Sequence, residues 1–382
     1  MTKNTTAQKR ITTRAKEVKK AQATNQRLTI GLDLGDLTCR YCILDEVGEV
    51  VSEDRIPTTR TGLSSLLAKM PASRVALEVG THSPWVSRHI EQMGHEVIVA
   101  NSHKVKLITQ SSRKNDQIDA QKLARLARVD PKLLSPIRHR GEQAQWDLAV
   151  IRARAELIKT RTAMVNSARG LAKPTGERLK KCDADQVRQS MTEGLSENLK
   201  RVLGPLLKSI EAISEQIAEY DLRIEEIEKR YPEAELLLKP VYGVGTMISL
   251  SFILTIEDPQ RFAHSRDVGA YFGLQPRQRE SGDSQPQLGI SKTGDVMVRS
   301  LLVQGAQCIL RKVAPDSDLR AWGLSKMKSG GKRAKRRAIV AVARKLAVLL
   351  HRLWVTGEVY DPLYNRKAVQ AAKRQAKSKV AA

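Results

Sequence analysis

Apolar and polar residues along the first third of the chain follow the spacings of alternating strands and helices. Short apolar runs bounded by polar residues predict strands, and apolar residues three and four apart predict amphipathic helices. We therefore expect a mixed α/β domain over residues 28–135. The predicted strands cover residues 28–33, 38–44, 49–54, 74–78 and 96–99, and the predicted helices cover residues 63–70, residues 85–93 and a segment that opens at Asp116.

The order of these elements is informative. Three successive strands, then alternating helices and strands, and then a helix that carries acids is the order of the ribonuclease H-like (RuvC-like) fold. In that fold, acidic residues lie at neighbouring strand ends and on the last helix. We therefore predict this fold for residues 28–135 and expect the acids of the domain to cluster.

Residues 136–235 have the spacing of a coiled-coil helical hairpin. Apolar residues recur four and three apart on two arms, which is typical of helix pairing along a heptad pattern. A pairing between chains would make a homo-oligomer, dimer or tetramer. A hairpin within one chain, or a plain spacer, would give the same pattern. The predicted interface residues are Trp146, Val150, Ala153, Leu157, Thr160 and Met164 on the first arm, and Leu206, Ile210, Ile213, Ile217, Tyr220, Ile224 and Ile227 on the second.

Residues 236–365 form a third, mainly helical region. Apolar helices are predicted over residues 247–254, 296–310 and 339–353. The basic cluster at residues 326–337 contains two glycines and is predicted to be a flexible nucleic-acid contact.

The chain is strongly basic. Its 382 residues include 66 Lys and Arg against 41 Asp and Glu, so the formal net charge is +25 at pH 7. Each neutralised phosphate releases counterions, and a surplus of this size favours a nucleic-acid partner. A membrane surface is the competing interpretation, but the sequence has no run of 18 apolar residues and no apolar signal core. We expect a cytoplasmic protein with no membrane partner.

The two ends of the chain and its cysteines change this picture little. Residues 1–27 are predicted to be a disordered basic arm and residues 366–382 a basic tail, which would either tether phosphates or only add solubility. Cys39 and Cys42 lie three apart in a predicted strand, where their side chains point to opposite faces. We expect buried thiols there, not a metal or redox pair.

Four acids occupy positions suited to a divalent cation. Asp33 and Glu78 each end an apolar run, and Asp116 and Asp119 lie three apart at a helix start. Hard cations such as Mg²⁺ prefer oxygen ligands, and a bound metal would polarise a scissile phosphate. Helix capping is the alternative for Asp116. We predict that Asp33, Glu78, Asp116 and Asp119 bind Mg²⁺ (or Mn²⁺).

Several residues of the third region are candidates for nucleic-acid contacts. A turn with glycines before a helix lets backbone N–H groups approach a phosphate, although any tight turn needs such glycines. The cations nearby could bind phosphates or be solvated surface. The predicted nucleic-acid-binding residues are Gly243, Gly245, Arg277, Arg279, Lys292, Arg299, Lys332, Arg333, Lys335 and Arg336.

Motifs from both ends of the chain resemble one family, the DEDD transposases of bacterial insertion sequences known as IS110. The three acidic blocks of that family resemble residues 30–33, 76–81 and 114–120, and its C-terminal domain resembles residues 243–245, 261–262, 273–276, 280–282 and 290–294.

The resemblance implies an RNA-guided DNA transposase/recombinase that acts at the bacterial nucleoid. Its partners would be donor and target DNA and a bridge RNA, a structured RNA whose loops pair with both. Asp33, Glu78, Asp116 and Asp119 would be the metal ligands, and Ser281 the nucleophile in a C-terminal serine transposase domain (residues 236–365). Asn115 and Val79 depart from the usual family residues.

Two other functions fit the residues without the resemblance. A junction-resolving endonuclease would use the metal and water and no serine. A non-catalytic nucleic-acid-binding protein would need only the charge and the helical hairpin. Taken alone, Ser281 reads as a turn residue, with Ser284 and Ser291 as local rivals.

Overall fold

The computed structural model describes residues 27–101, 116–279, 286, 288–328 and 330–367. The chain divides into two compact units, residues 1–139 and residues 140–382. The predicted arm at residues 1–27 lies outside the described residues except for Arg27, and so does the predicted tail except for Arg366 and Lys367. No helix among the described residues is long and apolar enough to cross a membrane.

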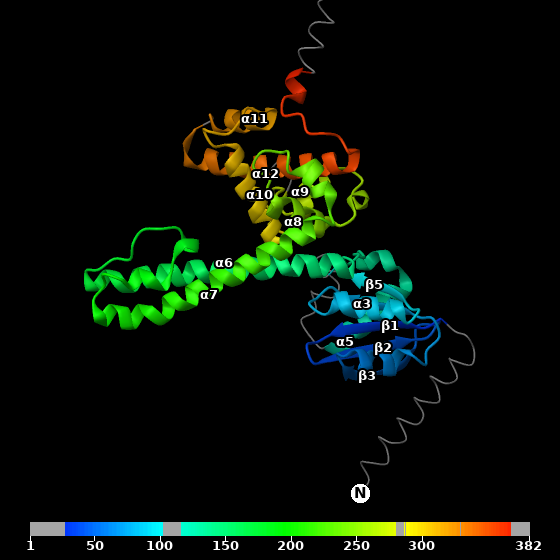
Figure 1. Cartoon of the computed structure of the whole chain (residues 1–382). Coiled ribbons are helices and arrows are strands. Elements are labelled where there is room, and N and C mark those ends of the chain that lie inside the picture. The colour runs from blue at the N-terminus through cyan, green and yellow to red at the C-terminus, as the bar shows by residue number, and fades with distance from the viewer. Residues whose placement is uncertain (1–26, 102–115, 280–285, 287, 329, 368–382) are drawn as a thin grey trace, which may run out of the picture. The chain divides into compact units, whose positions relative to one another are not determined.

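The first unit is built on one five-stranded sheet with the strand order β3-β2-β1-β4-β5 (Figure 1). The first three strands are antiparallel neighbours, whereas β1, β4 and β5 run parallel to one another. This arrangement confirms the predicted mixed α/β domain. The strands are β1 (Thr29–Leu34), β2 (Thr38–Leu44), β3 (Val50–Pro57), β4 (Arg74–Glu78) and β5 (Glu96–Ala100).

Helices cover both faces of this sheet. On one face, α2 (Arg60–Leu67) and α3 (Ser83–Gln92) share a buried core with Leu32 and Leu77. On the other face, α5 (Asp116–Val129) packs its small residues on the strands, followed by the short helix η1 (Pro131–Leu134). Alternate residues of one strand therefore face different helices.

Cys39 and Cys42 confirm this alternation. Both side chains are fully buried, and they belong to separate clusters on opposite faces of the sheet. Burial raises the pKa of each thiol to about 11, so both remain protonated at neutral pH. The predicted pair of buried thiols is confirmed.

The second unit begins with two long helices, α6 (Glu142–Ala172) and α7 (Glu197–Glu228), which lie side by side (Figure 1). Four of the predicted interface residues on α7 are buried: Ile210, Ile217, Ile224 and Ile227. The structure thus shows helix pairing within one chain, one of the alternatives that the sequence left open.

The interface on α6 differs from the predicted one. Trp146, which we predicted to lie in the interface, is 63% exposed, whereas Leu148 and Ile151 are buried. The reason is Asp147, a buried carboxylate that accepts a hydrogen bond from the Tyr231 hydroxyl at 2.8 Å and pairs with Arg230. A paired charge can occupy a buried helix face. Because Asp147 is charged, the apolar pattern did not indicate that its face of α6 is the one that packs.

The core of the rest of the unit contains α8 (Thr246–Ile256), in which every residue from Ile248 to Ile256 is buried. This helix contacts α6, α10 (Val296–Ile309) and the π-helix η5 (Ala234–Leu238), which precedes α8. The other α-helices of this unit are α9 (Asp267–Tyr271), α11 (Asp318–Met327) and α12 (Gly331–Thr356). The short 3₁₀ helices are η2 (Lys173–Thr175), η3 (Ala184–Gln186), η4 (Gln189–Thr192) and η6 (Pro259–Arg261).

The last helix corrects one prediction. We expected it to begin at Ile339 after a flexible basic segment, but α12 begins at Gly331, so most of that segment is helical. Ala334 and Ala338, four residues apart, are buried and extend the packed face, and Lys and Arg are good helix formers. The exposed side chains of Arg333, Lys335, Arg336 and Arg337 therefore belong to a helix.

A buried histidine in α12 predicts a pH dependence of stability. His351 is 1% exposed, with Nδ1 at 2.9 Å from the Ser265 hydroxyl and Nε2 at 2.9 Å from the Pro259 carbonyl. Burial lowers the pKa of His351, so the unfolded chain binds a proton more readily than the folded one. Stability of the second unit is expected to fall as the pH drops below about 6.5.

Urea unfolding between pH 7.5 and pH 5 measures this effect. His351→Gln should lower the unfolding free energy at pH 7.5 by about 1–3 kcal/mol through lost hydrogen bonds. It should also flatten the pH dependence. The exposed His264 provides the control, and His264→Gln should leave the wild-type slope in place. An unchanged slope in His351→Gln would show that other groups set it.

Candidate active site and nucleic-acid-binding surface

Two of the predicted metal ligands lie at the C-terminal ends of neighbouring parallel strands, Asp33 as the penultimate residue of β1 and Glu78 as the last residue of β4. The register of β1 and β4 pairs Leu32 with Leu77, and Asp33 and Glu78 are the next residue on each strand. Both carboxylates therefore lie at the same edge of the sheet. On the other side of Asp33, the antiparallel register places Arg40 of β2 opposite it.

A glycine lets α5 approach this edge closely. A Cβ on Gly31 would lie 2.0 Å from the Ala120 carbonyl oxygen, so only glycine allows the contact. Residues two apart on a strand share a face, so Asp33 lies on the same face as Gly31 and Glu78 on the same face as Ala76. Ala76 packs on α5, so this is the face that α5 covers.

The direction of α5 decides where its acids lie. Ala120, near the helix start, meets Gly31, and the Ala127 carbonyl accepts a hydrogen bond from Arg74 Nη1 at 3.0 Å. Arg74 opens β4, so α5 runs antiparallel to β1 and β4. Its first turn therefore lies at the edge where these strands end. The structure brings Asp119 to the same edge and face as Asp33 and Glu78.

The side chains at this edge have the right chemistry for a hard cation. Asp33, Glu78 and Asp119 are all partly buried, and Asp119 Oδ1 accepts from Lys122 Nζ at 3.5 Å. Asp116 is the first residue of α5, but its side chain lies outside the described residues. Within the described side chains, no group of three potential ligands is close enough to hold a metal. The donor types and their shared edge nevertheless fit Mg²⁺.

A polar contact that sequence reasoning missed links the loops after both strands. His82 Nε2 lies 3.1 Å from Asp36 Oδ1, and the Trp85 indole N–H donates to His82 Nδ1 at 3.1 Å. Asp36 follows β1 and His82 follows β4. The contact therefore ties together the two loops that follow the strand-end acids. The only sequence signal was the spacing of His82 and Trp85 at the start of a helix.

Ser281 lies outside the described residues, but the structure describes the chain on both sides of it, up to Arg279 and again from Leu288. Pro276 and Ile290 form an isolated antiparallel bridge. The Arg277 N–H donates to the Gly289 carbonyl at 3.0 Å, and the Ser291 N–H donates to the Gln275 carbonyl at 2.8 Å. These paired stems hold the two ends of the serine segment together. Arg277 and Arg279 are exposed on the stem that precedes it.

Close backbone contacts fix the base of these stems. A Cβ on Gly273 would lie 2.3 Å from the Thr293 carbonyl oxygen. Arg299 Nη1 donates to the carbonyls of Phe272 at 3.2 Å and Thr293 at 2.8 Å, so this predicted phosphate ligand supports the backbone. Lys292 is exposed with a φ of 57°, at the turn that these contacts hold.

The two glycines of the turn before α8 lie in different environments. Gly243 has a φ of 85°, and a Cβ there would lie 2.8 Å from the Gly305 carbonyl of α10. Helix packing accounts for this glycine. Gly245, by contrast, is exposed and caps the N-terminus of α8.

The described Lys and Arg side chains of the basic cluster on α12 are exposed. Arg333, Lys335 and Arg336 are exposed, while the side chain of Lys332 lies outside the described residues. Arg337, the last residue of the predicted cluster, is exposed too, and Arg344, which was not predicted, follows on the same helix. Their spacing from Arg333 would have indicated a shared face if the helix had been predicted to start earlier.

Both units match known transposases. Residues 30–175 match the model of the DEDD transposases of IS110, described as "Transposase", and residues 235–321 match the model described as "Transposase IS116/IS110/IS902 family".

Curated relatives carry the same description over most of the chain. The transposase for insertion sequence element IS1111A of Coxiella burnetii is 30% identical over 339 residues, which are 87% of this chain and 90% of that protein. The transposase for IS1328 of Yersinia enterocolitica is 29% identical over 77% of this chain and 87% of that protein. A probable family 20 transposase of Pseudomonas aeruginosa is 26% identical over 87% of this chain and 98% of that protein.

The protein is therefore an enzyme of DNA transposition. It belongs to the IS116/IS110/IS902 family of insertion-sequence transposases, and the acidic edge lies within the part that matches the DEDD model.

The contact at Gly31 predicts a large effect on stability. Gly31→Val forces α5 away from β1, and we expect it to lower the unfolding free energy of the first unit by about 3 kcal/mol or more. It should also lower DNA cleavage, since Asp119 moves with the helix. Urea unfolding measures the first effect. Gly80→Val is the control, because a Cβ at Gly80 has no atom within 4 Å; equal losses in both variants would refute the argument.

Proposed function

We propose that this transposase cleaves and rejoins DNA strands through a metal-assisted phosphoserine intermediate, guided by a bridge RNA. The observation that supports it most is the edge of the sheet where Asp33, Glu78 and Asp119 share one face. Family membership supports the transposition part of the proposal. The RNA guide and the serine are expectations from the resemblance of residues 280–282 and 290–294 to the family motif.

The strand order supports a ribonuclease H-like domain in the first unit. Three antiparallel strands and two parallel ones, in the order β3-β2-β1-β4-β5, place β1 and β4 side by side. Because Asp33 and Glu78 lie near the C-terminal ends of these two strands, the strand order supports a shared carboxylate site. An acidic residue in the first turn of α5 is added by the close approach at Gly31.

Asp33, Glu78, Asp116 and Asp119 would hold one or more Mg²⁺ or Mn²⁺ ions. When bound, the metal polarises the scissile phosphate and neutralises the charge that develops on its oxygens. The carboxylates supply hard oxygen ligands and fix the position of the phosphate relative to the protein. Arg40, opposite Asp33 on β2, supplies a positive charge at the same edge.

Ser281 is the proposed nucleophile. Its Oγ forms a bond to phosphorus, the bond from phosphorus to one DNA oxygen breaks, and the serine proton is released as that strand leaves with a free hydroxyl. The phosphoserine keeps the energy of the phosphodiester. A hydroxyl of another strand can then attack phosphorus, restore a phosphodiester and release Ser281 without ATP.

The partners follow from charge and from the resemblance. A net charge of +25 favours binding to both RNA and DNA. The bridge RNA would select donor and target DNA by base pairing. A homo-oligomer is proposed through the heptad residues of α6 and α7 that pairing within the chain leaves exposed, such as Trp146.

Recombination between two plasmids tests the proposal. Donor and target plasmids are incubated with the protein, the RNA transcribed from the flanks of its element, and Mg²⁺. Recombinant plasmids that need both RNA and Mg²⁺ are expected. Linear plasmids with no recombinants would instead indicate a hydrolytic endonuclease, and recombination without RNA would refute guidance. Mixing Asp33→Asn subunits with Ser281→Ala subunits would show whether two copies can complement each other.

A further inference from the structure

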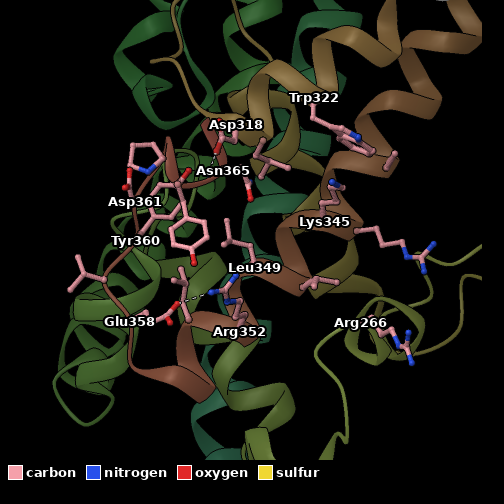
Figure 2. Close-up of a pocket in the computed structure, with 18 residues that line it drawn as sticks. Arg266, Asp318, Trp322, Lys345, Leu349, Arg352, Glu358, Tyr360, Asp361 and Asn365 are labelled. Carbon is pink, nitrogen blue, oxygen red and sulfur yellow. Dashed lines mark hydrogen bonds and ion pairs between the residues drawn. The ribbon is translucent and has the colours of Figure 1, made fainter. Parts of the chain in front are cut away.

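A groove in the second unit is lined by none of the residues discussed so far as catalytic candidates. It has a volume of about 900 Å³ and is lined by α11, α12 and the segment that follows α12 (Figure 2). Its floor is apolar and includes Leu319, Val348 and Leu349. In Figure 2, Trp322 and Lys345 lie together on one side of Leu349, and Tyr360 and Glu358 lie on the other.

Aromatic rings in this groove are paired with cations. Lys345 Nζ lies 4.2 Å from the centroid of the Trp322 ring, and Arg352 Cζ lies 5.4 Å from that of Tyr364. Trp322 is partly buried and Tyr364 is 53% exposed. Exposed aromatic faces beside Lys and Arg are what single-stranded nucleic acid uses, because bases stack on the rings and phosphates meet the cations.

The acids of the groove are already neutralised. Asp318 pairs with Arg366 at 3.1 Å and Asp361 with Lys367 at 2.9 Å. Glu358 likewise pairs with Arg352 at 3.0 Å.

Three further cations line the groove: Arg266, Arg344 and Lys345. None of them forms an ion pair within the described part of the chain. The groove therefore presents net positive charge around an apolar floor, which complements a nucleic acid better than a neutral peptide.

The geometry of α12 places a row of arginines, Arg333, Arg337 and Arg344, on the same face as part of the groove. Arg333, Arg337 and Arg344 are four and seven residues apart, and Ala341 and Val348 of the groove have the same spacing. All five therefore lie on one face of the helix. From Arg333 to Arg344 the helix rises about 16 Å, at about 1.5 Å per residue. A strand bound along this row would lead into the groove.

We propose that this groove binds single-stranded nucleic acid. One unpaired base stacks on Trp322 and takes the place of the Lys345 ammonium, which then pairs with a neighbouring phosphate together with Arg344. This proposal rests on the proposed function in one respect, which is that the protein binds unpaired strands. The site needs neither Ser281 nor a metal, so it can be tested independently of the chemistry.

Photo-cross-linking locates the base. The full-length Ser281→Ala variant is mixed, without Mg²⁺, with short single-stranded DNA or RNA that carries 5-iodouracil, which cross-links to aromatic side chains in stacking contact. Trypsin releases Trp322 in the peptide of residues 321–326. A cross-link on this peptide is expected, and the DNA and RNA arms show which strand the groove prefers. Cross-links confined to other peptides in both arms would overturn the proposal.

Two substitutions of the same residue distinguish stacking from simple apolar contact. Quenching of 2-aminopurine in the bound strand reports stacking of a base. Trp322→Phe should keep the quench, whereas Trp322→Leu should weaken binding of the strand about tenfold and abolish the quench. If Leu behaves like Phe, the groove takes an apolar segment instead. Lys345→Gln should lower the salt dependence of binding, and Lys208→Gln, exposed on α7, should not.

Discussion

Asp33→Asn is expected to lower DNA strand cleavage in Mg²⁺ at least about 100-fold without unfolding the first unit. Asn keeps the size of the side chain but removes the negative charge that is proposed to bind a hard cation. Lewis-acid stabilisation contributes several kcal/mol to the transition state, and each 1.36 kcal/mol is a factor of ten in rate. Gel electrophoresis of end-labelled DNA substrates measures the cleavage rate.

The position of Asp33 makes this the most informative of the four acids. It has Glu78 beside it on β4, Arg40 opposite it on β2, and the first turn of α5 over the same face. Asp54→Asn is the matched control, because Asp54 is exposed on β3 of the same sheet. Cleavage by Asp33→Asn at the rate of Asp54→Asn would contradict the metal site.

Ser281→Ala is expected to abolish strand exchange and the covalent protein–DNA adduct, a loss of at least about a thousandfold. The methyl group cannot attack phosphorus, and loss of a nucleophile typically removes most of the rate enhancement. Nucleic-acid binding should remain, because the described stems and cations around the segment are unchanged. Anisotropy of labelled DNA and recombination between plasmids measure the two properties separately.

The control lies in the same segment. Ser284→Ala changes a serine three residues away and should keep both adduct and exchange. An enzyme that uses water as the nucleophile would still cleave DNA, and give the same products, in the Ser281→Ala variant. Persistent cleavage in that variant would therefore favour the junction-resolving endonuclease. Loss of the adduct and of strand exchange in Ser284→Ala but not in Ser281→Ala would show that Ser281 is not the nucleophile.

The strands of the sheet, and the positions of Asp33 and Glu78 at its edge, could be predicted well from the sequence. The strands at residues 38–44 and 74–78 match the structure, because their apolar runs are bounded by polar residues or turns on both sides. The shared edge of Asp33 and Glu78 follows once β1 and β4 are parallel neighbours. The sequence could not show how closely α5 approaches, since that depends on the missing side chain of Gly31 and the small Ala120.

Other features depended on interactions that a local pattern does not contain. The burial of Asp147 requires Arg230 and Tyr231, more than 80 residues away, so the packed face of α6 was hidden. Arg299 was predicted to contact nucleic acid, and the sequence could not show that its guanidinium also donates to the backbone carbonyls of Phe272 and Thr293. The start of α12 at Gly331, earlier than predicted, depends on the packing of Ala334, which is buried.

Mass spectrometry of the protein–DNA adduct tests the central claim most directly. The protein is incubated with its RNA and DNA substrates in Mg²⁺ and digested with nuclease and trypsin. Cleavage after Arg279 and Lys292 gives the peptide of residues 280–292, which contains Ser281, Ser284 and Ser291, so fragment ions must locate the modified residue. We predict a nucleotide phosphate on Ser281 that is absent from Asp33→Asn. Cut or rejoined DNA with no adduct, or an adduct on another residue, would contradict the account.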